Sequence, residues 1–262
     1  MSSEQTLDWL SYVKSISTAS RTIKFTMNGS SGSPIILEWK KTDIRSPDLA
    51  QFKKDISELA AQTLAPAEVD FLQAYPFAVS QELFLKSCAP LFEKGLDAVN
   101  WELAKQTVES TIRQFYLTDL SSFGEAILKP LLDDIYFLVM IKETDSDLLG
   151  FAMFAITPAL PFGHVKLINI ALTSKGKDQN LEQLLMSSIF KIIPRIEKLF
   201  LFVRPTNKAA LKTYSDWGFT KALNPAQDPN HKINMDYLIF LEYRTEKSSS
   251  LQEIAETFLG QA

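Results

Sequence analysis

The sequence predicts an α/β (α+β) fold, in which a sheet is flanked by helices. Three observations support this class: short apolar runs of strand length, a segment of helical periodicity between two of them, and a strand–turn–helix unit that ends at a glycine. The strand-like runs, rich in β-branched and aromatic residues, are Ile135–Ile141, Leu149–Ile156, Val165–Leu172 and Leu199–Val203. The helix-like segment, Leu181–Ile193, lies between the third run and the fourth. Strands and helices therefore alternate through the second half of the chain.

Residues 1–75 predict a separate N-terminal extension. Its elements, in order, are a helix over Gln5–Ser17, a β-hairpin of Arg21–Met27 and Pro34–Trp39, a helix over Ser46–Leu64 and a short helix over Ala67–Gln73. Asn28–Ser33 is rich in turn residues and joins the two hairpin strands, while Ser46 and Pro47 are typical of a helix start. We therefore expect a helix–hairpin–helix module before the main domain.

Residues 76–245 predict the main domain, and residues 246–262 predict a linker followed by a docking helix. From Ser80 to Leu132 apolar residues recur at helical spacing, so this stretch is predicted to be mainly helical. Tyr237–Tyr243 predicts a final strand. The C-terminal helix could pack on its own domain or on another chain. The extension and this helix are therefore the expected contacts of a homo-oligomer or a protein partner.

Composition excludes several classes of protein. The chain has 262 residues, 46% of them hydrophobic, and a net charge of −4, which suits a folded domain without a basic surface for nucleic acid. No apolar run reaches the roughly 20 residues of a membrane span, and the first residues lack the pattern of a secretion signal. The single cysteine, Cys88, cannot form an internal disulfide. We expect a cytoplasmic protein that binds neither nucleic acid nor membrane.

The most informative motif follows the fourth strand-like run and reads N-x-x-A-x-x-x-Y-x-x-x-G-F. It comprises Asn207, Ala210, Tyr214, Gly218 and Phe219. The first three residues can share one side of a short helix because they are three and four positions apart, and the glycine is suited to ending that helix. This side of the helix faces either a ligand or the protein core.

The motif resembles the C-terminal half of the GNAT family of acetyl-CoA-dependent N-acetyltransferases, and the order of elements over residues 130–245 is similar to the family's. The resemblance implies a central mixed, mostly antiparallel sheet flanked by helices, with acetyl-CoA as the acyl donor. It implies that Asn207 and the helix it opens, including Ala210, lie along the pantetheine arm of coenzyme A. It also implies that Tyr214 protonates the departing thiolate, since a tyrosine with an ordinary pKa of about 10 is protonated at neutral pH.

The same resemblance implies that a backbone N–H stabilises the oxyanion of the reaction. In the family this donor lies where the third strand bulges and diverges from the next strand, a place that corresponds to Asn169–Leu172. Ile170, Ala171 and Leu172 are therefore expected to contact the acyl donor.

The loop after the third strand departs from the family pattern. The family's pyrophosphate loop reads R/Q-x-x-G-x-G/A, whereas Ser174–Asn180 keeps only Gly176. Loop glycines let backbone N–H groups approach a phosphate closely, so Gly176, with Lys175 and Lys177, is the expected pyrophosphate contact. Two alignments of the loop are possible, one on Gly176 and one on the helix that follows. Alternatively, the segment is a solvated loop that ends in a helix cap at Asp178 or Asn180.

A general base is not evident in the third strand, because Lys166–Asn169 contains no carboxylate. His164 begins this strand and titrates in a useful range, so it is the candidate base, with a structural role as the alternative. Cys88 lies in an apolar helical context and is expected in the core. His164 and His231 are far apart in sequence, and no spacing of His, Cys, Asp or Glu predicts a metal site.

These patterns predict an acyl-CoA-dependent N-acyltransferase, with acetyl-CoA the simplest donor and a primary amine, on a small molecule or a protein, as the acceptor. Two alternatives remain open. The missing loop glycines and the absent carboxylate would suit a catalytically silent relative that serves as a binding or scaffolding module. The altered loop could also suit a different acyl thioester.

Overall fold

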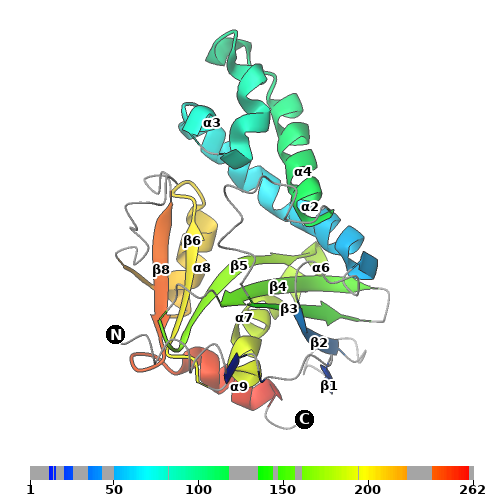
Figure 1. Ribbon diagram of the computed structural model, residues 1–262, viewed down its shortest axis with the longest axis vertical. Helices are drawn as coiled ribbons and strands as arrows, with labels where there is room; N and C mark the ends of the chain where they lie inside the picture. The colour runs from blue at the N-terminus through cyan, green and yellow to red at the C-terminus, as the bar shows by residue number, and fades with distance from the viewer. Residues whose placement is uncertain are drawn as a thin grey trace.

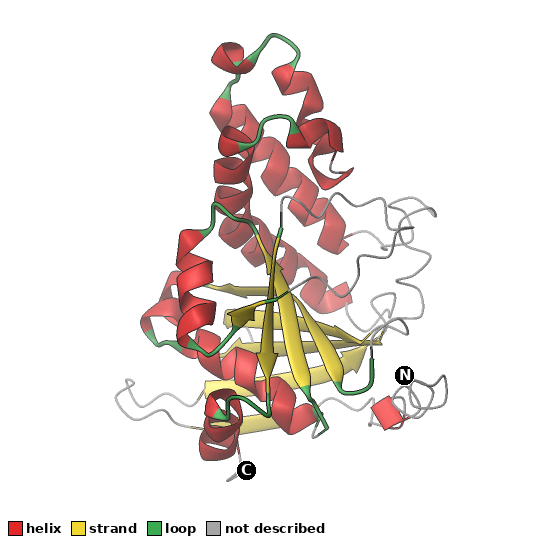
Figure 2. Cartoon of the chain, turned by 90° about the vertical axis from the view of Figure 1, so that its left-hand side faces the viewer, coloured by secondary structure: helices red, strands yellow, loops and turns green. Residues whose placement is uncertain are grey.

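The computed structural model describes residues 12–13, 15, 21–25, 35–42, 50–81, 83–117, 135–143, 147–156, 161–193, 195–222 and 238–259. The described strands form one eight-stranded sheet in the order β1-β2-β3-β4-β5-β6-β8-β7 (Figure 1). Every described strand pair is antiparallel except β5 and β6. Helices lie on both sides of the sheet (Figure 2). The predicted mixed, mostly antiparallel sheet flanked by helices is confirmed.

The strands predicted in the second half of the chain are all present. Their bounds are β3 Ile135–Lys142, β4 Leu148–Ile156, β5 His164–Leu172, β6 Lys198–Val203 and β8 Ile239–Arg244. A two-residue strand, β7 (Thr220–Lys221), pairs with β8 at the sheet edge. The sequence did not predict β7, because two residues are too few to show a periodicity.

The N-terminal hairpin is continuous with the main sheet. Strands β1 (Arg21–Phe25) and β2 (Ile35–Thr42) pair as predicted, and β2 also pairs with β3 in antiparallel register. Leu37 is fully buried in the same apolar cluster as residues of β3 and β4. The hairpin of the predicted extension thus shares one sheet with the predicted main domain. Most of the predicted helix over Gln5–Ser17 lies outside the described residues.

One helix replaces the two that were predicted after the hairpin. Helix α2 (Ala50–Ala74) continues through Pro66, where the sequence predicted a break. Proline inside a helix removes one backbone hydrogen bond and costs about 3 kcal/mol. Here Ala61, Ala65 and Val69 are buried along one face of α2, and packing of this face against the sheet outweighs that cost.

The region predicted as mainly helical contains irregular helix as well. Its described elements are α3 (Ala78–Gln81), the 3₁₀ segments η2 (Leu83–Phe92) and η3 (Leu96–Ala98), and α4 (Trp101–Leu117). Cys88, in η2, is fully buried as predicted, and burial raises the pKa of its thiol. Helix α4 packs along α2, and Arg113 on α4 forms an ion pair with Glu58 on α2.

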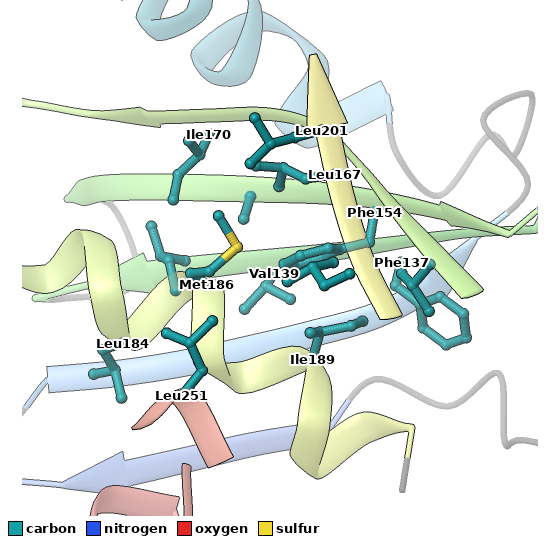
Figure 3. Packing of buried hydrophobic residues seen from close by; sticks show 14 of the residues in the cluster. Phe137, Val139, Phe154, Leu167, Ile170, Leu184, Met186, Ile189, Leu201 and Leu251 are labelled. Atoms are coloured by element: carbon teal, nitrogen blue, oxygen red, sulfur yellow. The ribbon is translucent and has the colours of Figure 1, made fainter. Parts of the chain in front are cut away.

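The sheet carries one apolar core on each face. On one face, helices α7 (Leu181–Ile192) and α9 (Ser250–Leu259) cover residues such as Val139 and Phe154 (Figure 3). On the other face, α2 and α4 cover the opposite side chains of β3, β4 and β5. The C-terminal helix α9 packs on α7, so it docks on its own domain, one of the two places expected for it.

Candidate active site

Strands β5 and β6 run side by side only over their first residues. The parallel ladder joins His164–Lys166 to Lys198–Phe200 and stops there. Beyond it, β5 turns toward β4 and β6 toward β8, so the two strands diverge (Figure 1). The divergence leaves two strand edges that face each other without a ladder between them, and a ligand can supply the missing hydrogen bonds.

A β-bulge lies in β5 where the divergence begins. Asn169 pairs with Met153 and Leu167 with Phe154, so Ile168 is an extra residue on β5. An extra residue increases the local twist and bends the strand away from its neighbour. The bulge therefore explains why the ladder to β6 stops after Lys166. The resemblance implied a bulge and a divergence at this place, and the structure has both.

The backbone of β5 alternates between β4 and the open edge. The N–H of Thr173 donates to the carbonyl of Leu149 on β4 at 2.9 Å. Because successive residues of a strand direct their N–H groups to opposite sides, Leu172 and Ile170 direct theirs toward β6 and Ala171 directs its own toward β4. Of the three predicted contacts, Ile170 and Leu172 therefore present backbone groups to the open edge, and Ala171 does not.

The turn after β6 opens a helix at Asn207, as the motif predicted. Helix α8 (Lys208–Asp216) has Asn207 as its N-cap, and the side-chain oxygen of Asn207 accepts a hydrogen bond from the N–H of Ala210 at 3.0 Å. Gly218 ends the unit with φ of 93°, a conformation that favours glycine. The cap fixes Asn207 at the divergence, on the side of β6.

Tyr214, in the last turns of α8, has most of its ring in the core. It is 7% exposed, and its ring packs against Trp217 and Phe219 at centroid distances of 5.6 Å. Burial raises the pKa of Tyr214 well above its ordinary value, and the negative charge of Glu182 raises it further. Glu182 belongs to the first turn of α7, which follows β5. The hydroxyl of Tyr214, on the helix after β6, is therefore within electrostatic reach of the helix after β5.

The strand order, the bulge in β5 and the divergence of β5 from β6 decide the architecture. It is the mixed, mostly antiparallel sheet flanked by helices that the resemblance to the GNAT family implied. No protein-family model and no curated protein matches the sequence.

Solved structures of N-acetyltransferases are similar to this chain at low sequence identity. The PaiA N-acetyltransferase from Thermoplasma acidophilum, in complex with coenzyme A, is 16% identical, with a TM-score of 0.43 over 79% of this chain and 98% of the other. A protein from Desulfovibrio desulfuricans assigned to the GNAT acetyltransferase family is 13% identical, with the same coverage and a TM-score of 0.38. The ribosomal-protein-S18-alanine N-acetyltransferase from Escherichia coli is 21% identical, with a TM-score of 0.32 over 42% and 68% of the two chains.

The segment that corresponds to the GNAT pyrophosphate loop is a short helix. Residues Ser174–Asp178 form α6, and the hydroxyl of Thr173 caps it by accepting the N–H of Gly176 at 3.1 Å. A side chain at Gly176 would place its Cβ 2.5 Å from the carbonyl oxygen of Leu149, so packing against β4 also requires glycine here. The predicted phosphate contact therefore has an N–H that is already bonded within the protein. The alternative of a solvated loop is wrong in secondary structure, because Ser174–Asp178 is helical and Gly176 is buried. Its other two parts are present, since the remaining residues of α6 are exposed and Asn180 is the N-cap of α7.

The predicted lysines of this segment differ in their surroundings. Lys175 forms an ion pair with Glu143, whereas Lys177 is exposed and lies near Glu182. Asn180 occupies the N-cap position of α7 in the left-handed conformation, without a side-chain cap bond. Of the two lysines, Lys177 is thus the one placed at the start of α7, where a helix N-terminus favours an anion.

Two buried oxygens in the described residues lack a hydrogen-bond partner, and both lie in segments that adjoin the divergence. They are Oε1 of Gln179, just before α7, and Oγ1 of Thr206, just before Asn207. An unpaired buried polar atom costs about 1–3 kcal/mol. Each of these two oxygens therefore fits a hydrogen bond from a polar ligand or from ordered water.

His164 lies at the wrong end of β5 for the predicted base. It pairs with Lys198, and four residues, roughly 13 Å of strand, separate it from the bulge at Ile168. Burial, together with the charges of Lys198 and Arg244, lowers the pKa of His164 to about 4. A neutral imidazole whose conjugate acid is so strong is a poor base for an ammonium group. The structure therefore favours the structural alternative.

Replacing His164 with Gln is expected to make the free energy of unfolding depend less on pH in the acid range. A histidine whose pKa is lower in the folded state than in the unfolded state binds more protons when the chain is unfolded. Its contribution to the free energy of unfolding is therefore complete above pH 6.5 and is lost as the pH falls toward 4. We expect the wild type to lose about 2 kcal/mol more than His164→Gln over this interval, allowing for solvent screening. Urea unfolding at several pH values measures this difference, and parallel profiles would contradict it.

The described part of the chain lacks two further features. It contains no cluster of three or more His, Cys, Asp or Glu side chains that could hold a metal ion. None of its helices combines the length and the apolarity needed to cross a membrane.

Proposed function

We propose that the protein transfers an acyl group, acetyl in the simplest case, from a coenzyme A thioester to a primary amine. One observation carries this proposal. The divergence of β5 and β6 is flanked by the open backbone of Ile170 and by the turn at Asn207, which opens the helix that carries Tyr214. Similar acetyltransferase structures, one of them with coenzyme A bound, support the choice of donor.

The reaction is a direct transfer. The amine, in its neutral form, attacks the thioester carbon, a C–N bond forms, and the carbonyl oxygen gains negative charge. The N–H of Ile170, which β5 directs to its open edge, is the proposed donor that stabilises this oxygen. The C–S bond then breaks, and the hydroxyl of Tyr214 is the proposed proton donor to the thiolate, since its raised pKa keeps it protonated. The amine proton leaves to solvent.

The donor's long arm would lie between the two segments that hold unpaired oxygens. Thr206 and Asn207 offer polar groups beside the pantetheine arm, while the first N–H groups of α7 and the side chain of Lys177 are placed for the pyrophosphate. Glu182, in the same turn of α7, opposes a bound polyanion, although burial raises the pKa of its carboxyl group. The sequence analysis did not single out Glu182, because an acidic residue in a first helical turn is ordinary.

Glu182→Gln is therefore expected to tighten binding of acetyl-CoA. Removing one nearby negative charge should gain about 1 kcal/mol, or about fivefold in the dissociation constant, at moderate salt. Glu253→Gln is the matched control, since Glu253 occupies the first turn of α9 instead. Calorimetric titration measures both, and equal affinities of Glu182→Gln and the wild type would show that this carboxylate does not face the pyrophosphate.

The activity itself is tested with a panel of amines. Purified protein, acetyl-CoA and each amine are combined, free thiol is followed with time, and the acetylated amine is identified by mass spectrometry. A sample without amine measures simple hydrolysis of the thioester. Amine-dependent thiol release with the matching product supports the proposal. No product with polyamines, amino acids, peptides or aminoglycoside-like amines would oppose it.

A silent binding module is the second candidate, and one observation favours it. The N–H of Gly176, the glycine that the loop retains, already donates to Thr173. If this bond persists, the segment has fewer free backbone N–H groups for a pyrophosphate than the family pattern provides. Absence of any coenzyme A binding would select this candidate over the enzyme.

A further inference from the structure

A buried ion pair joins the end of β6 to helix α2. Arg204 follows the last residue of β6, and its Nη2 and Nε contact the carboxylate of Glu68 on α2 at 2.9 and 3.1 Å. The side chains are only 9% and 18% exposed. The guanidinium also lies 4.1 Å from the centre of the Phe71 ring, which is fully buried. We call Arg204, Glu68 and Phe71 the clamp.

Helix α2 reaches both sides of the divergence. Its apolar face, including Val69 and Leu72, belongs to the cluster that contains Ala171 of β5 and against which Ile168 of β5 packs. Among the described residues, that cluster contains no residue of β6. The clamp is therefore the polar connection that fixes the end of β6 to the helix that packs on β5.

The clamp leads directly to the residue that opens α8. The carbonyl of Arg204 accepts the N–H of Asn207 at 3.0 Å, and Asn207 in turn caps the N–H of Ala210. The side chain of Arg204 thus holds the turn from the α2 side, while its backbone holds Asn207. Arg204 thus links α2 to Asn207 through its side chain on one side and its backbone carbonyl on the other.

We propose that Arg204 is a positioning residue, and that the clamp sets the separation of β5 and β6 and the placement of Asn207 for the acyl-CoA arm. This inference rests on the proposed function. A planar guanidinium with two bonds to one carboxylate and an aromatic ring against its face is held in a defined orientation. Lysine cannot reproduce this geometry, because its ammonium group is a single point charge.

The matched control is the second ion pair between α2 and a distant element. Arg113 on α4 contacts Glu58 on α2 at 2.7 and 3.1 Å, so it has the same two-point geometry. This ion pair joins the two helices, and the ion pairs of Arg113 in the described residues involve no residue of β5 or β6. Arg113→Met therefore removes an ion pair of the same geometry, although a more exposed one, at a place away from the divergence.

The experiment compares acetyl-CoA affinity with thermal stability in five variants of the full chain. We expect Arg204→Met and Glu68→Gln to weaken binding at least tenfold, and Arg204→Lys to weaken it despite retaining the charge. Arg113→Met should bind within twofold of the wild type, whatever its melting temperature. The double variant Glu68→Met/Arg204→Met should regain much of the stability lost in Arg204→Met, because apolar residues can replace a buried ion pair, but not the affinity.

Two results would overturn the proposal: clamp variants that bind like the wild type, or affinity that simply follows melting temperature in all variants, Arg113→Met included. If the wild type itself binds no acetyl-CoA, the proposed function fails and the clamp is judged by amide hydrogen exchange. Exchange at Asn207–Leu211 should then be faster in Arg204→Met than in the wild type and unchanged in Arg113→Met. Equal exchange in Arg204→Met and the wild type would dismiss the clamp.

Discussion

Ile170→Pro is expected to lower kcat about 100- to 1000-fold while the sheet remains folded, which is the range seen when one oxyanion donor is removed. The substitution deletes the N–H that β5 directs to the open edge. Because no ladder to β6 exists beyond Lys166, this deletion breaks no strand pairing. Steady-state kinetics with saturating acetyl-CoA, together with circular dichroism, measure the effect.

Ala171→Pro is the control for this prediction. Ala171 directs its N–H to β4, so proline at this position removes a ladder bond inside the sheet and should destabilise the protein by about 3 kcal/mol or more. The two neighbouring prolines thus separate a catalytic loss from a folding loss. Full turnover by a folded Ile170→Pro variant would eliminate Ile170 as the oxyanion donor.

Tyr214→Phe is expected to lower kcat about 100-fold, the lower range for loss of a general acid, with little change in the dissociation constant of acetyl-CoA. The hydroxyl is the only group removed, and the ring retains its packing against Trp217 and Phe219. Since burial and Glu182 hold the pKa of Tyr214 well above 10, its ionisation should not lower kcat between pH 7 and 10. Pre-steady-state kinetics at several pH values separate proton donation from binding.

Tyr243→Phe is the matched control for Tyr214→Phe. Tyr243 is fully buried in the same core, and its hydroxyl donates to the carbonyl of Ser248 at 2.7 Å and accepts the N–H of Leu251. Losing these bonds should cost about 2 kcal/mol of stability and leave kcat unchanged. Equal loss of kcat in the two variants, or none in Tyr214→Phe, would remove the tyrosine from the mechanism.

The sequence predicted the elements whose signal is local. Strands β3 to β6 are short apolar runs between polar turns, so their bounds differ from the predicted ones by at most two residues. The unit from Asn207 to Gly218 was predicted as a whole, because a cap, a helical spacing and a terminal glycine are properties of adjacent residues. Fold class and the position of α8 followed from these two kinds of signal.

The errors fall where long-range contacts decide the structure. A proline predicts a helix break, yet α2 continues through Pro66 because its buried face packs on the sheet. A hairpin of residues 21–42 cannot reveal from its own pattern that it will pair with β3, about 100 residues later in the chain. The polar stretch Ser174–Asp178 becomes helical because Thr173 caps it and Gly176 fits against β4.

The sequence predicted site residues from their chemical type, and the folded surroundings of those residues change the assignment. His164 has suitable chemistry in isolation, but Lys198 and Arg244, which lower its pKa, come from strands far along the chain. The contact of Arg204 with Glu68 joins residues 136 positions apart, and neither residue belongs to a motif. Such pairs have no periodicity or spacing, so only the folded chain reveals them.

The central claim is that the divergence of β5 and β6 binds an acyl-CoA thioester. Isothermal titration of the wild-type protein with acetyl-CoA at moderate salt tests it most directly. We expect one site per chain with a micromolar dissociation constant, accompanied by a rise in melting temperature with ligand concentration. No heat and no change in melting temperature at millimolar acetyl-CoA would contradict the claim and identify the chain as a silent module with this fold.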